Sequence, residues 1–168
     1  ITPNQRMTVT SLPSSQAEKP KETPPATDYS EVVGADAVWA AGVTGEGVSV
    51  AILDTGVIKS DALKKNSHGN GNRLKAWKDF VDGGGNLEDP NGQGTHIAGV
   101  IANSQVGADQ KYNGIAPDVN LVIGRVADAD GFASYEDVLS GIQWVIQNKQ
   151  QYNIRVLNFS MSAAVLSP

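Results

Sequence analysis

One aspartate stands where a buried strand is expected to end. The run Val-Ser-Val-Ala-Ile-Leu at 48–53 is apolar enough for a buried parallel strand, and Asp54 follows it directly. In open α/β sheets, ligands bind beyond the carboxyl ends of the strands. A carboxylate there is shielded from water and needs partners. It can orient an imidazole, serve phosphotransfer or Mg²⁺ binding, or cap local backbone N–H groups.

A second segment, Gly-Gln-Gly-Thr-His-Ile-Ala-Gly at 92–99, is typical of a helix that packs closely on a sheet, and we expect the helix from Thr95 to Ala102. Gln93 has no nitrogen that titrates near neutral pH, so it cannot take a proton from a hydroxyl, although it can donate a hydrogen bond to a carboxylate. His96 lies about one helical turn further along. We expect His96 to be a buried histidine satisfied by hydrogen bonds.

Together, Ile-Leu-Asp-Thr-Gly at 52–56 and the 92–99 segment resemble the Asp and His blocks of the subtilisin-like serine proteases, the subtilases. In that family the first block supplies the Asp of the catalytic triad, the second begins His-Gly-Thr-His, and the chain order is Asp, His, Ser. The resemblance implies that Asp54 is the orienting carboxylate and that Gln93 occupies the position of the catalytic base. The sequence does not decide whether Gln93 is natural or engineered.

Two further segments resemble the substrate cleft of the same family. Residues 128–135, Asp-Ala-Asp-Gly-Phe-Ala-Ser-Tyr, are similar to the segment that binds peptide as an extended strand. The resemblance implies backbone pairing by Gly131, Phe132 and Ala133. Residues 156–162, Val-Leu-Asn-Phe-Ser-Met-Ser, resemble the family's Asn-x-Ser-x-Gly strand end. This implies an opposing edge made of Ser160, Met161 and Ser162.

Both edges would hold a peptide by β-augmentation, in which main-chain hydrogen bonds give broad affinity and side-chain pockets give selectivity. Ser162 stands where the family usually has glycine. A side chain there would narrow the first pocket or bend the strand away, because glycine permits a closer backbone approach than serine does.

The order of the elements indicates an α/β protein with a doubly wound, mostly parallel sheet that is incomplete in this chain. Helices are expected near Asp36 as an N-cap, at 95–102, and after a capping pair formed by Ser134 and Asp137. Residues 58–73 are expected to form a loop that leaves His68 at the surface. Strands are expected at 48–53, 74–81, 120–126 and 154–160.

Residues 32–168 are interpreted as the N-terminal part of a subtilase catalytic domain. Residues 11–31 are rich in Pro, Ser, Lys and Glu and are typical of a linker or a tail. Residues 1–10 are either the remnant of a prosegment or a disordered tag or linker. No Gly-Thr-Ser block follows, so we expect the chain to be inactive by itself. We also expect the missing C-terminal part, or another copy, to cover strand 154–160.

The composition excludes several other classes. The net charge is −5 with scattered basic residues, no apolar run reaches membrane-spanning length, and the absence of cysteine excludes disulfides and thiolate metal sites. The resemblance to the subtilases implies a peptide or protein substrate as the partner and no required cofactor. Structural calcium is common in the family, but loop 103–113 offers one carboxylate, Asp109, where Ca²⁺ takes six to eight oxygens. The prosegment-like start favours a secreted protein, and the compartment is otherwise undetermined.

Two alternatives remain open. A natural pseudoprotease or peptide-binding module would explain Gln93 together with Ser162, because both residues depart from functional blocks of the family. An unrelated doubly wound domain could use Asp54 for phosphotransfer. No glycine-rich phosphate loop follows a strand and opens a helix, so a nucleotide site is poorly supported.

Overall fold

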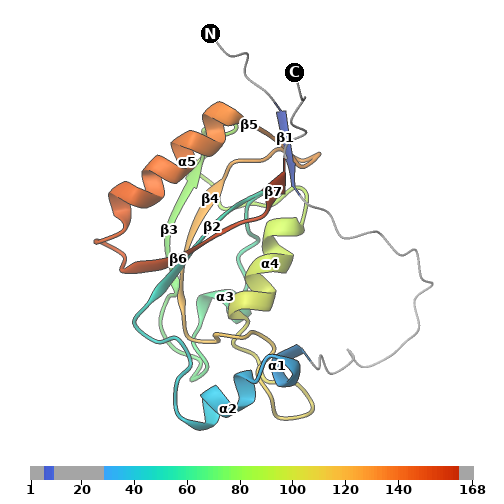
Figure 1. Ribbon diagram of the computed structural model, residues 1–168, viewed down its shortest axis with the longest axis vertical. Coiled ribbons are helices and arrows are strands. Elements are labelled where there is room, and N and C mark those ends of the chain that lie inside the picture. The colour runs from blue at the N-terminus through green and yellow to red at the C-terminus, as the bar shows by residue number, and fades with distance from the viewer. Residues whose placement is uncertain (1–5, 10–28, 163–168) are drawn as a thin grey trace, which may run out of the picture.

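The computed structural model describes residues 6–9 and 29–162, and its centre is a sheet of four parallel strands (Figure 1). The spatial order is β3-β4-β2-β6, and each neighbouring pair is parallel. The four predicted strands are thus present: three are one or two residues shorter than expected, and the strand expected at 48–53 is shifted by one residue. Their bounds are β2 Ser49–Asp54, β3 Leu74–Asp79, β4 Asn120–Arg125 and β6 Ile154–Phe159.

Helices cover both faces of this sheet, so the predicted doubly wound α/β architecture is confirmed. Side chains of β2 alternate between the faces, as the geometry of a strand requires. Ala51 and Leu53 share a core cluster with residues of α5 (Tyr135–Asn148). Val50 and Ile52 share the other cluster with residues of α4 (Gln93–Ala102) and α3 (Asp61–Lys64).

A second, smaller sheet lies beyond the carboxyl ends of the parallel strands. It consists of three short strands in the order β5-β1-β7, and both pairings are antiparallel. The central strand comes from the start of the chain and the outer two come from its second half. Their bounds are β1 Arg6–Val9, β5 Phe132–Ser134 and β7 Met161–Ser162.

The capping pair that the sequence predicts for α5 is present. The Asp137 backbone N–H donates to Ser134 Oγ at 3.1 Å, and the Ser134 hydroxyl donates to the Asp137 carboxylate at 2.6 Å. Ser134 therefore both ends β5 and begins α5, which fixes the junction between the small sheet and the helix layer.

Several predicted boundaries are wrong. Residues 58–73 are not all loop, because α3 (Asp61–Lys64) interrupts them. Asp36 lies in the first turn of α2 (Ala35–Ala40) and does not cap it, since the cap position is taken by Gly34 with φ 72°. Helix α4 begins at Gln93, two residues before the predicted start.

The N-terminal helix α1 (Tyr29–Val32) begins inside the segment that the composition assigns to a linker. The rest of that linker and residues 1–5 lie outside the described residues. Among the described helices, none combines the length and the apolar character that a bilayer-spanning segment needs.

Candidate active site

Strand β2 delivers Asp54 to the carboxyl edge of the parallel sheet. The strand is buried along its whole length, and Asp54 itself is 1% exposed. Its Oδ1 accepts a hydrogen bond from the Thr55 backbone N–H at 2.8 Å, whereas Oδ2 is buried and accepts none. Burial raises the pKa of Asp54 to about 6, although the hydrogen bonds from Thr55 work against the rise. The carboxylate thus has one oxygen available to a donor.

The start of helix α4 lies directly against this strand end. A Cβ atom built on Gly94 would stand 2.0 Å from the Gly56 carbonyl oxygen and 3.2 Å from the Asp54 Cβ. The Gly94 N–H donates to Thr55 Oγ1 at 3.1 Å. Only glycine allows this approach, since any side chain would collide with the backbone of the strand end. Gln93, the half-buried first residue of α4, is therefore carried to the neighbourhood of Asp54.

A second buried carboxylate, Asp89, ties the strand end to the helix, and the sequence analysis missed it. Asp89 Oδ1 accepts from Thr55 Oγ1 at 2.7 Å and from the Gly92 N–H at 2.8 Å. Its Oδ2 accepts from the N–H of Thr95 at 2.8 Å and from the hydroxyl of the same residue at 2.6 Å. The sequence feature that could have identified Asp89 is the turn Asp-Pro-Asn-Gly at 89–92, which comes immediately before Gln93.

Arg125 lies beside Asp54 in the sheet, but its guanidinium forms ion pairs with other carboxylates. It pairs in register with Asp54, is 3% exposed, and its Nη1 donates to three carboxylates. These are Asp79 at 3.0 Å, Asp82 at 2.9 Å and Glu88 at 3.3 Å. The ion pairs anchor the loop that runs from β3 to α4, so Arg125 helps to place the helix without neutralising Asp54.

The two predicted cleft edges lie on either side of an extended strand, and that strand belongs to the chain itself. Strand β1 is antiparallel to β5 through the pairs Met7↔Ala133 and Thr8↔Phe132. It is antiparallel to β7 through Thr8↔Ser162 and Val9↔Met161. Ser162 therefore does not bend β7 away from the cleft. Ser160 lies between β6 and β7, where its Oγ accepts from Asn158 Nδ2 at 3.3 Å, and it is not part of the pairing.

Gly131, which directly precedes β5, adds a main-chain hydrogen bond to the last residue of β1. Its carbonyl accepts from the Val9 N–H at 2.8 Å, and its φ of 81° is a conformation that side chains rarely adopt. A Cβ on Gly131 would lie 2.5 Å from Val9 Cγ2, so the bound strand fills the space that the glycine leaves. Met7 is 9% exposed and joins the core cluster that underlies α5.

A family model described as "Subtilase family" matches residues 45–166, which is more than half of the chain. The chain belongs to the subtilase family. The Major intracellular serine protease of Bacillus subtilis is 36% identical over 71% of this chain and 36% of its own length. Subtilisin BL of Lederbergia lenta is 34% identical over 78% of this chain and 43% of its own length.

A third relative, Serine protease AprX of Bacillus subtilis, is 34% identical over 62% of this chain and 22% of its own length. This subtilase chain thus spans less than half of the length of each of these three relatives, from 22% to 43%. A solved structure of a cold-adapted subtilisin-like serine proteinase aligns with a TM-score of 0.49 and 37% identity, over 62% of this chain and 34% of that one. Family membership removes the reason for the phosphotransfer alternative at Asp54.

The structure also shows how exposed the remaining candidate residues of this subtilase chain are. His96 is exposed, so the prediction of a buried histidine is wrong, because no described element covers its side of α4. His68 is exposed, as predicted. Asp109 is exposed, and its carboxylate accepts from the Lys111 N–H at 3.2 Å. The part of the chain that the structure describes has no group of three or more His, Cys, Asp or Glu that could hold a metal ion.

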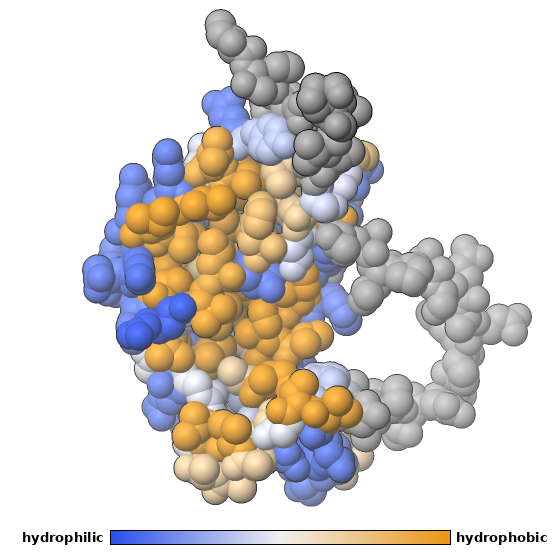
Figure 2. All heavy atoms as spheres, in the orientation of Figure 1, coloured by the Kyte–Doolittle hydropathy of each residue, from blue (hydrophilic) through white to orange (hydrophobic). Residues whose placement is uncertain are grey.

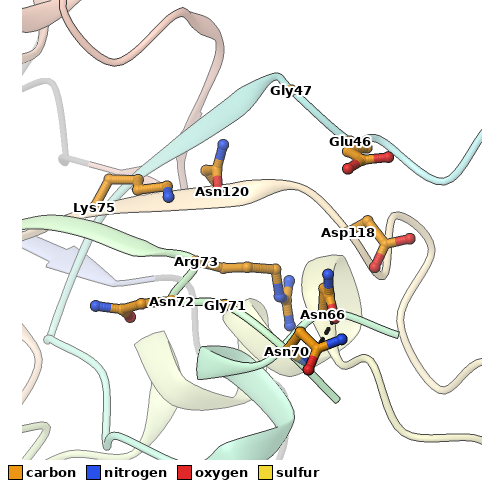
Figure 3. Close-up of a pocket in the computed structure, with 10 residues that line it drawn as sticks. All are labelled: Glu46, Gly47, Asn66, Asn70, Gly71, Asn72, Arg73, Lys75, Asp118 and Asn120. Atoms are coloured by element: carbon orange, nitrogen blue, oxygen red, sulfur yellow. Dashed lines mark hydrogen bonds between the residues drawn. The ribbon is translucent and has the colours of Figure 1, made fainter. Parts of the chain in front are cut away.

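A polar pocket of about 240 Å³ lies at the opposite, amino-terminal edge of the sheet, where β3 and β4 begin (Figure 3). Its floor is the buried guanidinium of Arg73, which donates to the carbonyls of Lys65, Val119, Ala62 and Ala102 at 2.7–2.9 Å. Asp118 beside it accepts from Ser67 at 2.7 and 2.9 Å. Both charged groups are thus engaged in holding loops together, away from Asp54.

Because the pKa of Asp54 is raised in the folded state, the free energy of unfolding of the chain should depend on pH. The folded pKa of about 6 exceeds the ordinary value of 3.8, so the folded state binds the proton more tightly. The free energy of unfolding must then fall as the pH rises from about 4 to about 6, by up to about 3 kcal/mol. We expect Asp54→Asn to be more stable than the parent by roughly 1–3 kcal/mol at about pH 7.5. The difference should disappear near pH 3.5, as urea denaturation at both pH values can measure. An equal difference at both pH values would rule out this origin.

Proposed function

We propose that this chain is part of a subtilisin-like serine endopeptidase, and that it supplies the orienting carboxylate, the helix of the catalytic base and both edges of the peptide cleft. The observation that carries the proposal is the antiparallel seating of β1 between β5 and β7. An extended segment held by main-chain pairing on both sides is how a peptide substrate would bind there. The position of β1 also supports the interpretation of residues 1–10 as a prosegment remnant.

The chemistry of the whole enzyme would be hydrolysis of a peptide bond through an acyl-enzyme. A base at position 93 would take the proton from a serine, and the open Oδ2 of Asp54 would accept the N–H of that base and hold its orientation. In this chain the base is replaced by the carboxamide of Gln93, which cannot take a proton. The described residues include no serine block of the family, so we propose that this chain alone does not hydrolyse peptides.

The chain's own strand indicates which peptides the cleft accepts. Side chains alternate along an extended strand, so Met7 and Val9 point to one side and Thr8 to the other. Met7 is buried and Val9 is half-buried against Gly131, whereas Thr8 is exposed. A preferred peptide therefore carries two apolar residues separated by one residue of free choice.

A competition experiment tests this cleft. A fluorescent peptide containing Arg-Met-Thr-Val should bind a variant that lacks residues 1–10, with fluorescence anisotropy as the readout. The intact chain should bind it at least about tenfold more weakly, because a tethered competitor has an effective concentration near the millimolar range. Thr8→Pro in the full-length chain should release the cleft in the same way, since proline removes a main-chain donor at a position where the side chain is exposed.

The matched control is Gly131→Val in the chain that lacks residues 1–10. The new side chain would occupy the space of Val9 Cγ2, so peptide binding should be lost while the circular dichroism spectrum is retained. Equal affinity of the peptide for the intact and the shortened chain would contradict the proposed cleft.

A natural pseudoprotease that only holds peptides is the second candidate. Gln93 favours it, because a carboxamide keeps a hydrogen-bonding role beside Asp54 and loses the proton transfer. The pairing of Ser162 with Thr8 also favours it, since the departure from glycine leaves the edge able to pair. The codon at position 93 in the native gene discriminates the two candidates: a histidine codon removes the pseudoprotease.

A further inference from the structure

The sequence contains three Asn-Gly pairs, at 70–71, 91–92 and 113–114. An asparagine before glycine is chemically labile, because the missing Cβ lets the glycine nitrogen approach the amide carbon of the asparagine side chain. The reaction requires a glycine N–H that is not held in a hydrogen bond and an asparagine side chain that can turn. The three pairs differ in both respects.

Two of the pairs hold the glycine nitrogen in a hydrogen bond. The Gly92 N–H donates to Asp89 Oδ1 at 2.8 Å, and the Asn91 side chain donates to a main-chain carbonyl at 3.0 Å. The Gly114 N–H donates to the Asn103 carbonyl at 2.9 Å, and a Cβ on Gly114 would stand 2.3 Å from the Asn103 nitrogen. Reaction at either pair therefore requires local opening of the fold.

The pair Asn70–Gly71 meets both requirements. Both residues are exposed, and within the described ranges 6–9 and 29–162 the Gly71 N–H donates to no acceptor. A Cβ on Gly71 would have no atom within 4 Å beyond its chain neighbours, so a ring has room to close. Asn70 is held through its main chain: its N–H donates to Asn66 Oδ1 and its carbonyl accepts from the Asn66 N–H, both at 2.8 Å.

The loop around Asn70 has no apolar side chain of its own to shield it. Figure 2 shows apolar side chains gathered over α5 and β6, whereas residues 66–72 are all polar or glycine. The other end of this loop is fastened, because the Ser67 N–H, which follows Asn66, donates to Asp118 Oδ1 at 2.7 Å. Asn70 is thus the asparagine of the loop whose reaction needs no hydrogen bond to break.

We propose that Asn70 is a site of spontaneous deamidation, in which the Gly71 nitrogen closes a succinimide ring on the Asn70 side chain. Solvent hydroxide takes the proton of the Gly71 N–H, and the nitrogen forms a bond to Asn70 Cγ. The bond from Cγ to the side-chain nitrogen breaks, and ammonia leaves. Water then opens the ring at either carbonyl, which gives aspartate or isoaspartate at position 70. No oxidant or reductant takes part.

The modification changes the charge of a defined part of the surface. The net charge of the chain goes from −5 to −6, because one neutral amide becomes one carboxylate. The new charge lies at the polar pocket that Asn70 and Gly71 line together with Glu46 and Asp118 (Figure 3). In the isoaspartate product the main chain also gains a methylene before Gly71, so the loop that Asn66 closes is the part expected to loosen.

Incubation of the full chain at mildly alkaline pH, followed by tryptic digestion and tandem mass spectrometry, tests the proposal. Trypsin releases Asn70 in the peptide 66–73, apart from the other two pairs. A mass gain of about 1 Da should accumulate at Asn70 at least about tenfold faster than at Asn91 or Asn113, since those two sites must first break a hydrogen bond. In guanidinium chloride, where the chain is unfolded, the three sites should react at similar rates.

Two variants make the result specific. Asn70→Gln should abolish the mass gain in peptide 66–73, because glutamine needs a larger ring that closes far more slowly, while both hydrogen bonds to Asn66 use the main chain of residue 70. The matched control is Asn72→Gln, an exposed asparagine of the same loop, which should leave the gain unchanged. No gain at Asn70, equal rates at the three pairs in the folded chain, or a gain that persists in Asn70→Gln would overturn the proposal.

Discussion

Replacing Gln93 with histidine is expected to raise peptide hydrolysis by about 10⁴-fold or more, once the chain is completed by a nucleophile-bearing subtilase segment. The reason is that an imidazole can take the serine proton and a carboxamide cannot. The open Oδ2 of Asp54 is available to orient the new side chain. In subtilisin, loss of the histidine alone lowers kcat by about 10⁶. Turnover of a chromogenic peptide, and its loss after treatment with a serine-directed inhibitor, measure the effect.

Two variants make this result specific to the proposed mechanism. Adding Asp54→Asn to Gln93→His should remove most of the gain, because the imidazole would lose its orienting acceptor. Gln93→Asn, which changes only the length of the carboxamide, should give no gain. If the histidine variant is no faster than its parent in an assembled complex, position 93 does not hold the catalytic base.

Asp89→Asn is expected to destabilise the chain by about 2–4 kcal/mol, because the new amide group faces donors in place of an acceptor. Asp89 accepts four hydrogen bonds, and the two on Oδ2 come from the N–H and hydroxyl of Thr95. An asparagine can keep the two bonds on Oδ1 but must present its NH₂ group to Thr95. Urea denaturation measures the loss, and faster hydrogen exchange at Gly92 and Thr95 would locate it.

The matched control is Asp82→Asn, which makes the same chemical change in the same loop. Asp82 is 67% exposed and pairs with Arg125 at 2.9 Å, so its loss should cost less than about 1 kcal/mol. Equal stability of the two variants would contradict the view that Asp89 fastens α4 to the end of β2.

Much of the architecture follows from local patterns. The run that forms β2 is apolar throughout, so its burial and its parallel neighbours are predictable from residues 48–53 alone. The capping pair of Ser134 and Asp137 is equally local, because its partners are three residues apart. The contact between Asp54 and the start of α4 was accessible only through the family resemblance, since 40 residues of chain separate Asp54 from Gly94.

The residues that hold the site in place were not predictable in the same way. Asp89 binds Thr55 across 34 residues, and Arg125 gathers carboxylates from three positions of a glycine-rich region. Neither belongs to a periodic pattern. The error at His96 has a different cause: helical spacing identifies the side of α4 on which it lies, but burial depends on whether another element covers that side.

Residues 6–9 illustrate a third kind of limit. The sequence of residues 1–10 left a prosegment remnant and a tag or linker equally open, because so short a segment carries too little pattern to define a strand. The register of β1 against β5 and β7 arises from partners more than 120 residues away in the chain. Only the tertiary structure could place them between the two cleft edges.

The most direct test of the central claim is the pKa of an imidazole introduced by Gln93→His, measured by NMR titration with and without Asp54→Asn. A buried carboxylate within contact range stabilises the charged imidazolium, so we predict a pKa above the ordinary value of about 6.5. The pKa should fall by about one unit or more when Asp54 is neutralised. An identical titration in both backgrounds would mean that Asp54 does not face position 93, and the proposed catalytic arrangement would be wrong.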